Sequence, residues 1–188
     1  MDFEALLKNR RSIRDFQDKD VPLDILREII QDSCFAPSSG NGQSCRFIII
    51  RKKDFIEKVS AESKRSYLAD LARNPGESYK KYENILRVKD FNVFYNAPCV
   101  VFVLGPAQIR SLQVDCALTV AYFMLSATSK GLGTCWIGLG DNIQNDKIIR
   151  EMGIPDDCRI VAPIAVGYPV SIPSVPERHA PDIIQVIE

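Results

Sequence analysis

Cys99-Val100-Val101-Phe102-Val103-Leu104 is a run of six apolar residues, three of them β-branched, near the middle of the 188-residue chain. Turn-forming residues bound the run, with Asn96-Ala97-Pro98 before it and Gly105-Pro106 after it. A β-branched run this short between turn residues predicts a strand that is buried on both faces. Arg46-Phe47-Ile48-Ile49-Ile50 predicts a second strand of the same kind. Together they predict a buried sheet.

Helical patterns alternate with these strands along the chain. The longest runs from Leu112 to Lys130, where Leu118, Tyr122 and Leu125 recur at helical spacing. Alanines make parts of this helix thin and permit close approach of another helix: Ala117, Ala121 and Ala127. Shorter helices are expected through Phe3, Leu6 and Leu7, from Pro22 to about Cys34, over Asp54–Ser63 and over Asn145–Met152.

Two further strands are expected, over Thr134–Gly138 and Arg159–Val166. From Lys64 to Asn96 the chain is rich in charge and tyrosine, with only weak helical periodicity around Tyr79 to Val88. The tail from Gly167 to Pro181 is proline-rich and can be neither a helix nor a central strand, so we expect residues 169–188 to form an extended C-terminal tail. No linker or repeat divides the chain, so we expect one domain over residues 1–188, of the α/β or α+β class.

Composition excludes several classes of function. Lysines and arginines number 24 and so do aspartates and glutamates, so the formal net charge is zero and there is no broad basic surface for nucleic acid or an anionic membrane. The longest apolar stretch, from Ala97 to Ala107, is too short to span a bilayer. The acidic start of the chain is unlike a secretory signal, so we expect a cytoplasmic protein.

The chain has six cysteines and a single histidine, His179. No two cysteines have the two-residue spacing of a zinc site, and most have apolar neighbours. We therefore expect no metal site and interpret the cysteines as small buried apolar side chains. With one histidine and no G-x-S-x-G motif, a hydrolytic triad is not expected either.

Arg10-Arg11-Ser12-Ile13-Arg14 is the first candidate binding segment. Guanidinium groups bind phosphate oxygens in pairs, and each sheltered contact contributes about 1.5 to 3 kcal/mol. Two or three such contacts could hold a phosphate monoester. A solvated basic turn at a helix end is the alternative.

The glycine-rich segment from Gly131 to Gly140 does not fit a nucleotide-binding loop. The pattern G-x-G-x-x-G would need glycine at Trp136 or Ile143, and the Walker pattern would need lysine at Leu139. A flat ligand lying against the backbone near Gly138 is the better functional interpretation, and a helix cap with tight strand ends is the alternative.

Two other segments could contribute to binding. The loop from Pro37 to Gln43 is dense in small hydrogen-bonding groups, although most such loops are only turns. Arg178 lies among the prolines of the tail and could reach a phosphate.

In this order, the motifs resemble those of the nitroreductase family of FMN enzymes. The similarity rests on five segments: Arg10 to Phe16, Ala36 to Gln43, Asn96 to Val101, Gly131 to Gly138 and Val166 to Pro169. They correspond to the family's R-R-S-x-R-x-F opening, its A-P-S-S-x-N-x-Q loop, its A-P strand start, its G-L-G-x-C-W-I-G strand and its G-Y-P turn. These segments are spread over nearly the whole chain, from Arg10 to Pro169.

The resemblance implies a three-layer α+β fold, in which helices flank a central, mostly antiparallel sheet, and an obligate homodimer with FMN at the interface. It implies that the ribityl phosphate contacts Arg10, Arg11, Ser12, Arg14 and Arg178. It implies that the flavin of the other subunit is reached by Pro37, Ser38, Ser39 and Asn41, and that the isoalloxazine lies against Ile137, Gly138 and Leu139. The helix over Leu112 to Lys130 would then form the dimer contact.

The implied reaction passes hydride from NADH or NADPH to flavin N5 and then to an electron-poor acceptor such as a nitroaromatic, quinone or enone. No catalytic side chain is expected, because the flavin carries the chemistry. A specialised flavin enzyme of the same fold, or a flavin-binding regulatory protein, is the alternative. Two departures stand out: Ser44-Cys45 replaces the family's usual Pro-Trp, and the segment 64–96, expected to cover substrate, has no recognisable signature.

Overall fold

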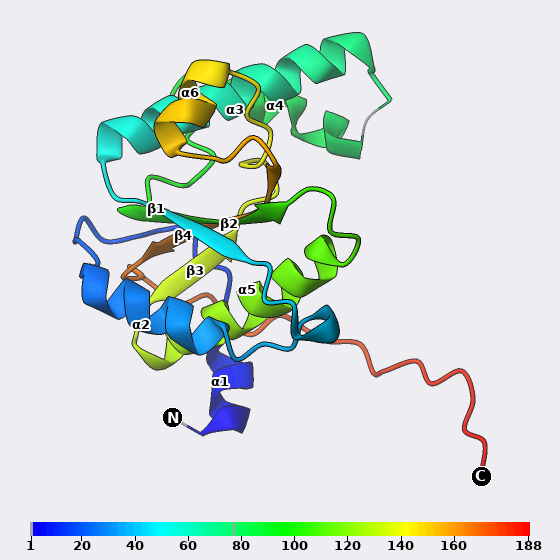
Figure 1. Ribbon diagram of the computed structural model, residues 1–188. Helices are drawn as coiled ribbons and strands as arrows, with labels where there is room; N and C mark the ends of the chain where they lie inside the picture. Colours follow the sequence, from blue (N-terminus) through cyan, green and yellow to red (C-terminus); the bar gives the residue numbers. More distant parts are fainter. Residues whose placement is uncertain (1, 77) are drawn as a thin grey trace.

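The centre of the computed structural model, which describes residues 2–76 and 78–188, is a four-stranded sheet (Figure 1). The strands are β1 (Arg46–Ile50), β2 (Cys99–Pro106), β3 (Gly133–Trp136) and β4 (Cys158–Gly167). Their order across the sheet is β1-β2-β4-β3, and every neighbouring pair is antiparallel. The expected α+β class with an antiparallel sheet is confirmed.

Helices cover both faces of the sheet, which gives the three expected layers (Figure 1). One face carries α2 (Leu23–Ser33) and α5 (Leu112–Ser129), with α1 (Phe3–Asn9) beyond them. The other carries α3 (Lys53–Arg73), α4 (Glu83–Arg87) and α6 (Asp146–Met152). Among the described residues, no helix is both long and apolar enough to cross a membrane.

Alternation along the central strand β2 builds a separate core on each face of the sheet. Val101 and Val103 pack with the apolar side chains of α2 and α5. Val100 and Phe102 point the other way and pack against the side of α3 and α6. All of β2 is buried, because it lies between β1 and β4 and is covered on both faces.

The helix α3 is longer than the sequence predicts, since it continues from Ser63 to Arg73. The expectation missed this half because polar side chains interrupt the buried face of α3: Ser60, Glu62, Ser63 and Ser66 are buried between Val59 and Tyr67. Hydrogen bonds replace apolar contacts there, so the apolar periodicity disappears. The rest of the segment 64–96 holds a short 3-10 turn, η2 (Ser78–Tyr82), and then α4.

The strand β3 ends at Trp136, two residues before the expected end at Gly138. The next position, Ile137, faces Pro163 of β4 and donates its N–H to the Pro163 carbonyl. Proline has no N–H to return, so the ladder cannot continue. Residues 137–139 therefore leave the sheet as irregular chain.

The outer edge of β3 is covered by the segment that follows α1. Ser12 forms a parallel bridge with Thr134, and the Ile13 N–H donates to the Thr134 carbonyl at 2.9 Å. A Cβ added to Gly133 would lie 2.6 Å from Cγ1 of Ile13, so this close approach requires glycine.

The chain exposes more surface than a compact monomer should. Its accessible surface is 11344 Å², whereas a 21.1 kDa globular monomer is expected to expose about 9,000 Å². Much of the excess comes from the tail after Val170, which runs away from the body past α5 (Figure 1). On α5 itself, Val114, Leu118 and Tyr122 form an exposed apolar stripe at four-residue spacing, whereas Ala127 packs into the core.

We expect Gly105→Ala to lower the free energy of unfolding by about 1 to 3 kcal/mol. A Cβ at this buried position in β2 would lie 2.7 Å from the Ser44 carbonyl oxygen and 2.5 Å from Cδ1 of Leu112. Urea unfolding measures the change. Gly76→Ala is the control, because the nearest atom to its Cβ is a side-chain oxygen of Asn74 at 3.8 Å; equal stability of the two variants would contradict the packing account.

Candidate functional site

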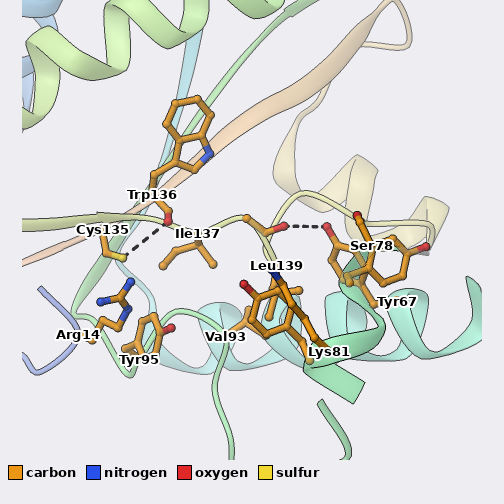
Figure 2. A pocket seen from close by; sticks show the side chains of 13 residues that line it. Arg14, Tyr67, Ser78, Lys81, Val93, Tyr95, Cys135, Trp136, Ile137 and Leu139 are labelled. Carbon is orange, nitrogen blue, oxygen red and sulfur yellow. Dashed lines mark hydrogen bonds between the residues drawn. The ribbon is translucent and has the colours of Figure 1, made fainter. Parts of the chain in front are cut away.

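A cavity of about 530 Å³ lies where the chain leaves β3 (Figure 2). One wall is the segment Cys135 to Leu139. The opposite wall comes from the segment 64–96, which contributes Tyr67, Ser78, Tyr79, Lys81, Tyr82, Val93 and Tyr95. Arg14 closes one end, with its guanidinium carbon 5.7 Å from the centre of the Tyr95 ring. A volume of this size suits a cofactor or a drug-sized molecule.

Of the cations in the extended segment after α1, only Arg14 lines this cavity, although Arg10 and Ser12 lie on the same side of the segment. Ser12, Arg10 and Arg14 all lie close enough to the Cys135 thiol to lower its pKa. Burial is the main effect on Cys135 and raises the pKa of its thiol, while the two guanidinium groups oppose that rise. Residues 10, 12 and 14 thus share one side of the segment.

Arg11 faces the other side. Its guanidinium donates to the carbonyl oxygens of Arg10 at 2.6 Å and Lys8 at 2.5 Å, and it lines a separate hollow beside Gly131 and Gly133. The structure therefore does not bring the Arg11 side chain to the cavity, and of the three arginines only Arg14 lines it. Neighbouring side chains of an extended segment point to opposite sides. The sequence motif alone does not indicate that the segment is extended, so it does not separate Arg11 from Arg10 and Arg14.

The cavity is positively charged. None of the described residues that line it is acidic, and within residues 2–76 and 78–188 neither Arg10 nor Arg14 forms an ion pair. Two guanidinium groups and a hydroxyl on one side of the chain form a donor set suited to a phosphate. This arrangement fits an anionic ligand.

Two side chains of α3 hydrogen-bond the backbone carbonyls of residues 138 and 139. The Tyr67 hydroxyl donates to the Gly138 carbonyl at 2.8 Å and also hydrogen-bonds Asp141, and Ser63 Oγ donates to the Leu139 carbonyl at 2.7 Å. Burial, followed by Asp141, raises the pKa of Tyr67. A Cβ on Gly138 would meet nothing within 4 Å, so the open side of this glycine leaves room for a flat ligand against the backbone.

The loop of Pro37, Ser38, Ser39 and Asn41 lies elsewhere, since none of its residues lines the cavity. Its 3-10 turn η1 (Ser39–Asn41) is fixed to α5 because the Ser39 N–H donates to Asp115 Oδ1 at 3.0 Å. Arg178 is exposed in the tail, which leaves the body on the side of α5, away from α3 and α4 (Figure 1). Within one chain, the loop and Arg178 therefore both lie apart from Arg14.

The sequence interpretation missed the aromatic wall of the cavity. Four of the chain's six tyrosines lie between residues 64 and 96, and all four line it: Tyr67, Tyr79, Tyr82 and Tyr95. That concentration was the available signal. Tyr95 adopts a left-handed conformation with φ 55°, which is unusual for a bulky residue and fixes its ring beside Arg14.

Glu62 of α3 hydrogen-bonds the backbone at Gln144, in the segment that follows the cavity wall. Its buried carboxylate accepts hydrogen bonds from Arg65 at 2.7 Å, Ser66 Oγ at 2.9 Å and the Gln144 N–H at 3.2 Å. Burial alone would raise the pKa of Glu62, but these hydrogen bonds outweigh burial and lower it. The charged form is therefore the one that stabilises the fold.

Glu62→Gln is expected to destabilise the protein at pH 7 by about 1 to 3 kcal/mol, because the amide is uncharged and its NH2 group cannot accept the hydrogen bond that Oε2 accepts from Arg65 Nε at 2.9 Å. Since the folded-state pKa of Glu62 is lowered, its stabilising effect is full above the usual pKa of about 4.3 and is lost as the pH falls through the folded value. Thermal unfolding should show the gap between wild type and variant closing in acid. Glu57→Gln, exposed on the same helix, is the control; a gap that is constant with pH would contradict the ionic role.

The fold defines the class of protein. A Bacteroides fragilis nitroreductase solved with bound FMN aligns at TM-score 0.82 and 22% identity, over 98% of each chain. An iodotyrosine deiodinase solved with FMN and 3-iodo-L-tyrosine aligns at TM-score 0.76 and 22% identity, over 98% of this chain and 99% of the other. The chain thus has the α+β fold of these proteins.

The nitroreductase family profile matches residues 7–168, and the chain belongs to the nitroreductase family. A Methanothermobacter thermautotrophicus relative, provisionally named NADH dehydrogenase/NAD(P)H nitroreductase, is 26% identical over 99% of this chain and 87% of its own. The iodotyrosine deiodinase of Thermotoga neapolitana is 25% identical over 87% of each protein. Similar proteins therefore carry names of two different reactions.

Proposed function

We propose that the chain binds FMN and passes reducing equivalents from NADH or NADPH to an electron-poor small molecule, such as a nitroaromatic, quinone or enone. The observation that carries the proposal is the cavity of about 530 Å³ with Arg14 at one end, open backbone at Gly138 along one wall and no acidic side chain among its described lining residues. When bound, FMN supplies the acceptance and donation of hydride. The chain then needs no catalytic side chain of its own.

The phosphate group would contact Arg10, Ser12 and Arg14. Their shared side of the extended segment and their lack of ion pairs within the described residues support this assignment. Charge-assisted hydrogen bonds from guanidinium to phosphate are short and directional, so they orient the cofactor as well as binding it. Arg11 would contribute only by fixing the end of α1.

The isoalloxazine would lie against Ile137, Gly138 and Leu139. Gly138 leaves open space there, and two hydroxyl groups of α3 fix the backbone carbonyls of Gly138 and Leu139. A rigid wall of this kind orients a bound ring for transfer, because it cannot relax away from it.

The segment 64–96 would cover the substrate. It contributes the aromatic wall of the cavity together with Lys81, whose ammonium lies 5.1 Å from the centre of the Tyr82 ring. Stacked aromatic rings favour flat acceptors. We propose that the acceptor enters between this wall and the cofactor.

A homodimer would complete the site. The extra exposed surface, the apolar stripe Val114, Leu118 and Tyr122 on α5 and the exposed apolar tail all support a partner of the same kind. The loop of Ser38 and Ser39 is fixed to α5, so a contact made by α5 would bring this loop to the other chain. The separation of Arg178 from Arg14 within one chain suits a tail that reaches across.

A specialised reaction on the same cofactor is the second candidate. The similarity to iodotyrosine deiodinases in sequence and in fold favours reductive removal of halide from an aromatic ring. Acceptor profiling separates this reaction from nitro or quinone reduction. A binding protein without turnover would be indicated if the reduced cofactor transferred nothing to any acceptor.

The visible absorption spectrum of the freshly purified protein tests the proposal. We expect flavin bands that bleach under anaerobic conditions on addition of NADH or NADPH and return with an electron-poor acceptor. Flavin bands that persist after addition of NADH and of NADPH would contradict the assignment of a nicotinamide as the electron donor. A pure dimer without flavin bands, even after incubation with FMN, would contradict the whole proposal.

A further inference from the structure

Three of the six cysteines gather on the sheet face that carries α2 and α5, and none of the three lines the cavity. Cys34 ends α2, Cys45 precedes β1, and Cys116 lies on α5 facing the sheet. The expectation of small buried apolar side chains holds for Cys99, Cys116 and Cys135, whereas Cys34 is exposed and Cys45 and Cys158 are half-buried. Within the described residues, no group of metal-ligating side chains could hold an ion. The cluster therefore needs another explanation.

Cys45 and Cys116 are in direct contact. Their Sγ atoms share a hydrogen bond at 3.5 Å, and Thr119 Oγ1 lies 3.4 Å from Cys45 Sγ. The hydrogen bond with Cys116 lowers the pKa of the Cys45 thiol, and that with Thr119 adds to the effect, against burial and the Asp115 carboxylate. The same contact raises the pKa of Cys116. Cys45 is thus the more readily ionised thiol of the pair, and it is also the one that is only half-buried.

A small oxidant can reach Cys45 from solvent. A hollow of about 90 Å³ is lined by Cys34, Ser38, Cys45 and Thr119. A single water needs only about 10 to 15 Å³ measured in this way, so the hollow accommodates hydrogen peroxide. Cys116 is fully buried, contacts Cys45 and does not line this hollow.

We propose that Cys45 and Cys116 form a reversible disulfide that responds to peroxide. The two sulfur atoms need to approach from 3.5 Å to the bonding distance of about 2.05 Å, a movement that side-chain rotation can supply. Formation of this disulfide requires no flavin, although the bond would act on the loop that we propose reaches the other chain. The pair includes Cys45, which stands in one of the two positions where the sequence departs from its family's usual Pro-Trp.

The oxidation has two steps. The Cys45 thiolate attacks one peroxide oxygen, the O–O bond breaks, and Cys45 becomes a sulfenic acid while the other oxygen leaves as water after taking up a proton. The Cys116 sulfur then attacks Cys45 Sγ, the S–O bond breaks, and the proton of Cys116 leaves with the hydroxide as a second water. In sum, two thiols are oxidised to one disulfide and one peroxide is reduced to two waters.

The disulfide would lock the start of β1 to α5. The same helix already holds the Ser39 turn through Asp115, and Gln43 donates its N–H to Ser38 Oγ at 3.0 Å. Oxidation would therefore staple both ends of the loop between Ser38 and Cys45 to one helix, which a thiol contact alone does not do.

Peptide mapping of the full-length, FMN-incubated protein tests the proposal. The reduced protein is treated with about one equivalent of hydrogen peroxide, its thiols are blocked with N-ethylmaleimide, and it is digested with trypsin. The Glu28–Arg46 peptide holds both Cys34 and Cys45, whereas Ser111–Lys130 holds Cys116 alone. We expect these two peptides to be joined, two of the six free thiols to be lost, and dithiothreitol to restore both.

Three variants assign the bond. Cys34→Ala should still form the joined peptides, and so should the control Cys158→Ser. Cys45→Ser, at a half-buried position, should abolish the joined peptides. A disulfide within Glu28–Arg46, sulfinic acid at Cys45 without joined peptides, a bond between two chains or six unreacted thiols would each overturn the proposal.

Discussion

Replacing Arg14 by alanine is expected to raise the dissociation constant for FMN about 30-fold. The guanidinium closes one end of the cavity beside Tyr95, and no carboxylate among the described residues competes for it. A sheltered charge-assisted hydrogen bond to phosphate contributes about 2 kcal/mol, which corresponds to that factor. Equilibrium dialysis of the apoprotein against FMN measures the change, and a matched loss for riboflavin, which lacks the phosphate, is not expected.

Arg27→Ala is the matched control, because Arg27 is an exposed arginine of α2 that pairs with Asp24. Arg11→Ala is the more informative comparison, since its side chain points away from the cavity and donates to the carbonyl oxygens of Lys8 and Arg10. It should lower thermal stability and leave FMN affinity within about twofold. Equal losses of FMN affinity in Arg11→Ala and Arg14→Ala would contradict the placement of the two guanidinium groups.

Leu118→Glu is expected to weaken the proposed dimer by about 100-fold or more, because symmetry would bury two unpaired carboxylates in one apolar contact. Leu118 is 38% exposed at the centre of the stripe on α5, and glutamate is a good helix former, so the single chain should remain folded. Analytical ultracentrifugation measures the association. Flavin absorbance should fall with the dimer, since the Ser39 loop is fixed to the same helix.

Ile85→Glu is the control for this change. Ile85 is 40% exposed on α4, on the opposite face of the sheet, so an equal change of polarity there should leave the association state alone. A Leu118→Glu protein that remains a dimer with bound flavin would show that α5 is not the contact.

The four strands and the helix α5 could be predicted from the sequence because their side chains follow simple patterns. The buried run in β2 and the shorter run in β1 are apolar and β-branched, which few other structures accept. The helix α5 is long and has apolar residues on the sheet side and the exposed side alike. Neither pattern depends on distant parts of the chain.

The second half of α3 could not be predicted because its partners are distant in sequence. Ser63 donates to the Leu139 carbonyl, and the Tyr67 hydroxyl donates to the Gly138 carbonyl at 2.8 Å. Buried serines of this kind look like surface residues until the groups that they bond are known. The same tertiary contacts bring the segment 64–96 over the cavity.

Within the candidate site, it was easier to predict which residues take part than to predict which way their side chains point. Gly138 and Arg14 lie at one cavity as their motifs suggested, but Arg11 in the same string faces another hollow. The tyrosine wall went unnoticed because aromatic residues at irregular spacing predict neither a helix nor a strand. Their meeting depends on the left-handed turn at Tyr95 and Asn96, which no local rule indicates for these residue types.

The separation of Arg14, which lines the cavity, from Ser39, which lies outside it, has a genetic consequence. If each complete site takes its arginines from one chain and its serine loop from the other, an Arg14→Ala allele and a Ser39→Trp allele damage complementary halves. A mixed dimer then contains one site with both lesions and one with neither. Co-expressed in one cell, two alleles that are each inactive alone would restore function, which is intragenic complementation.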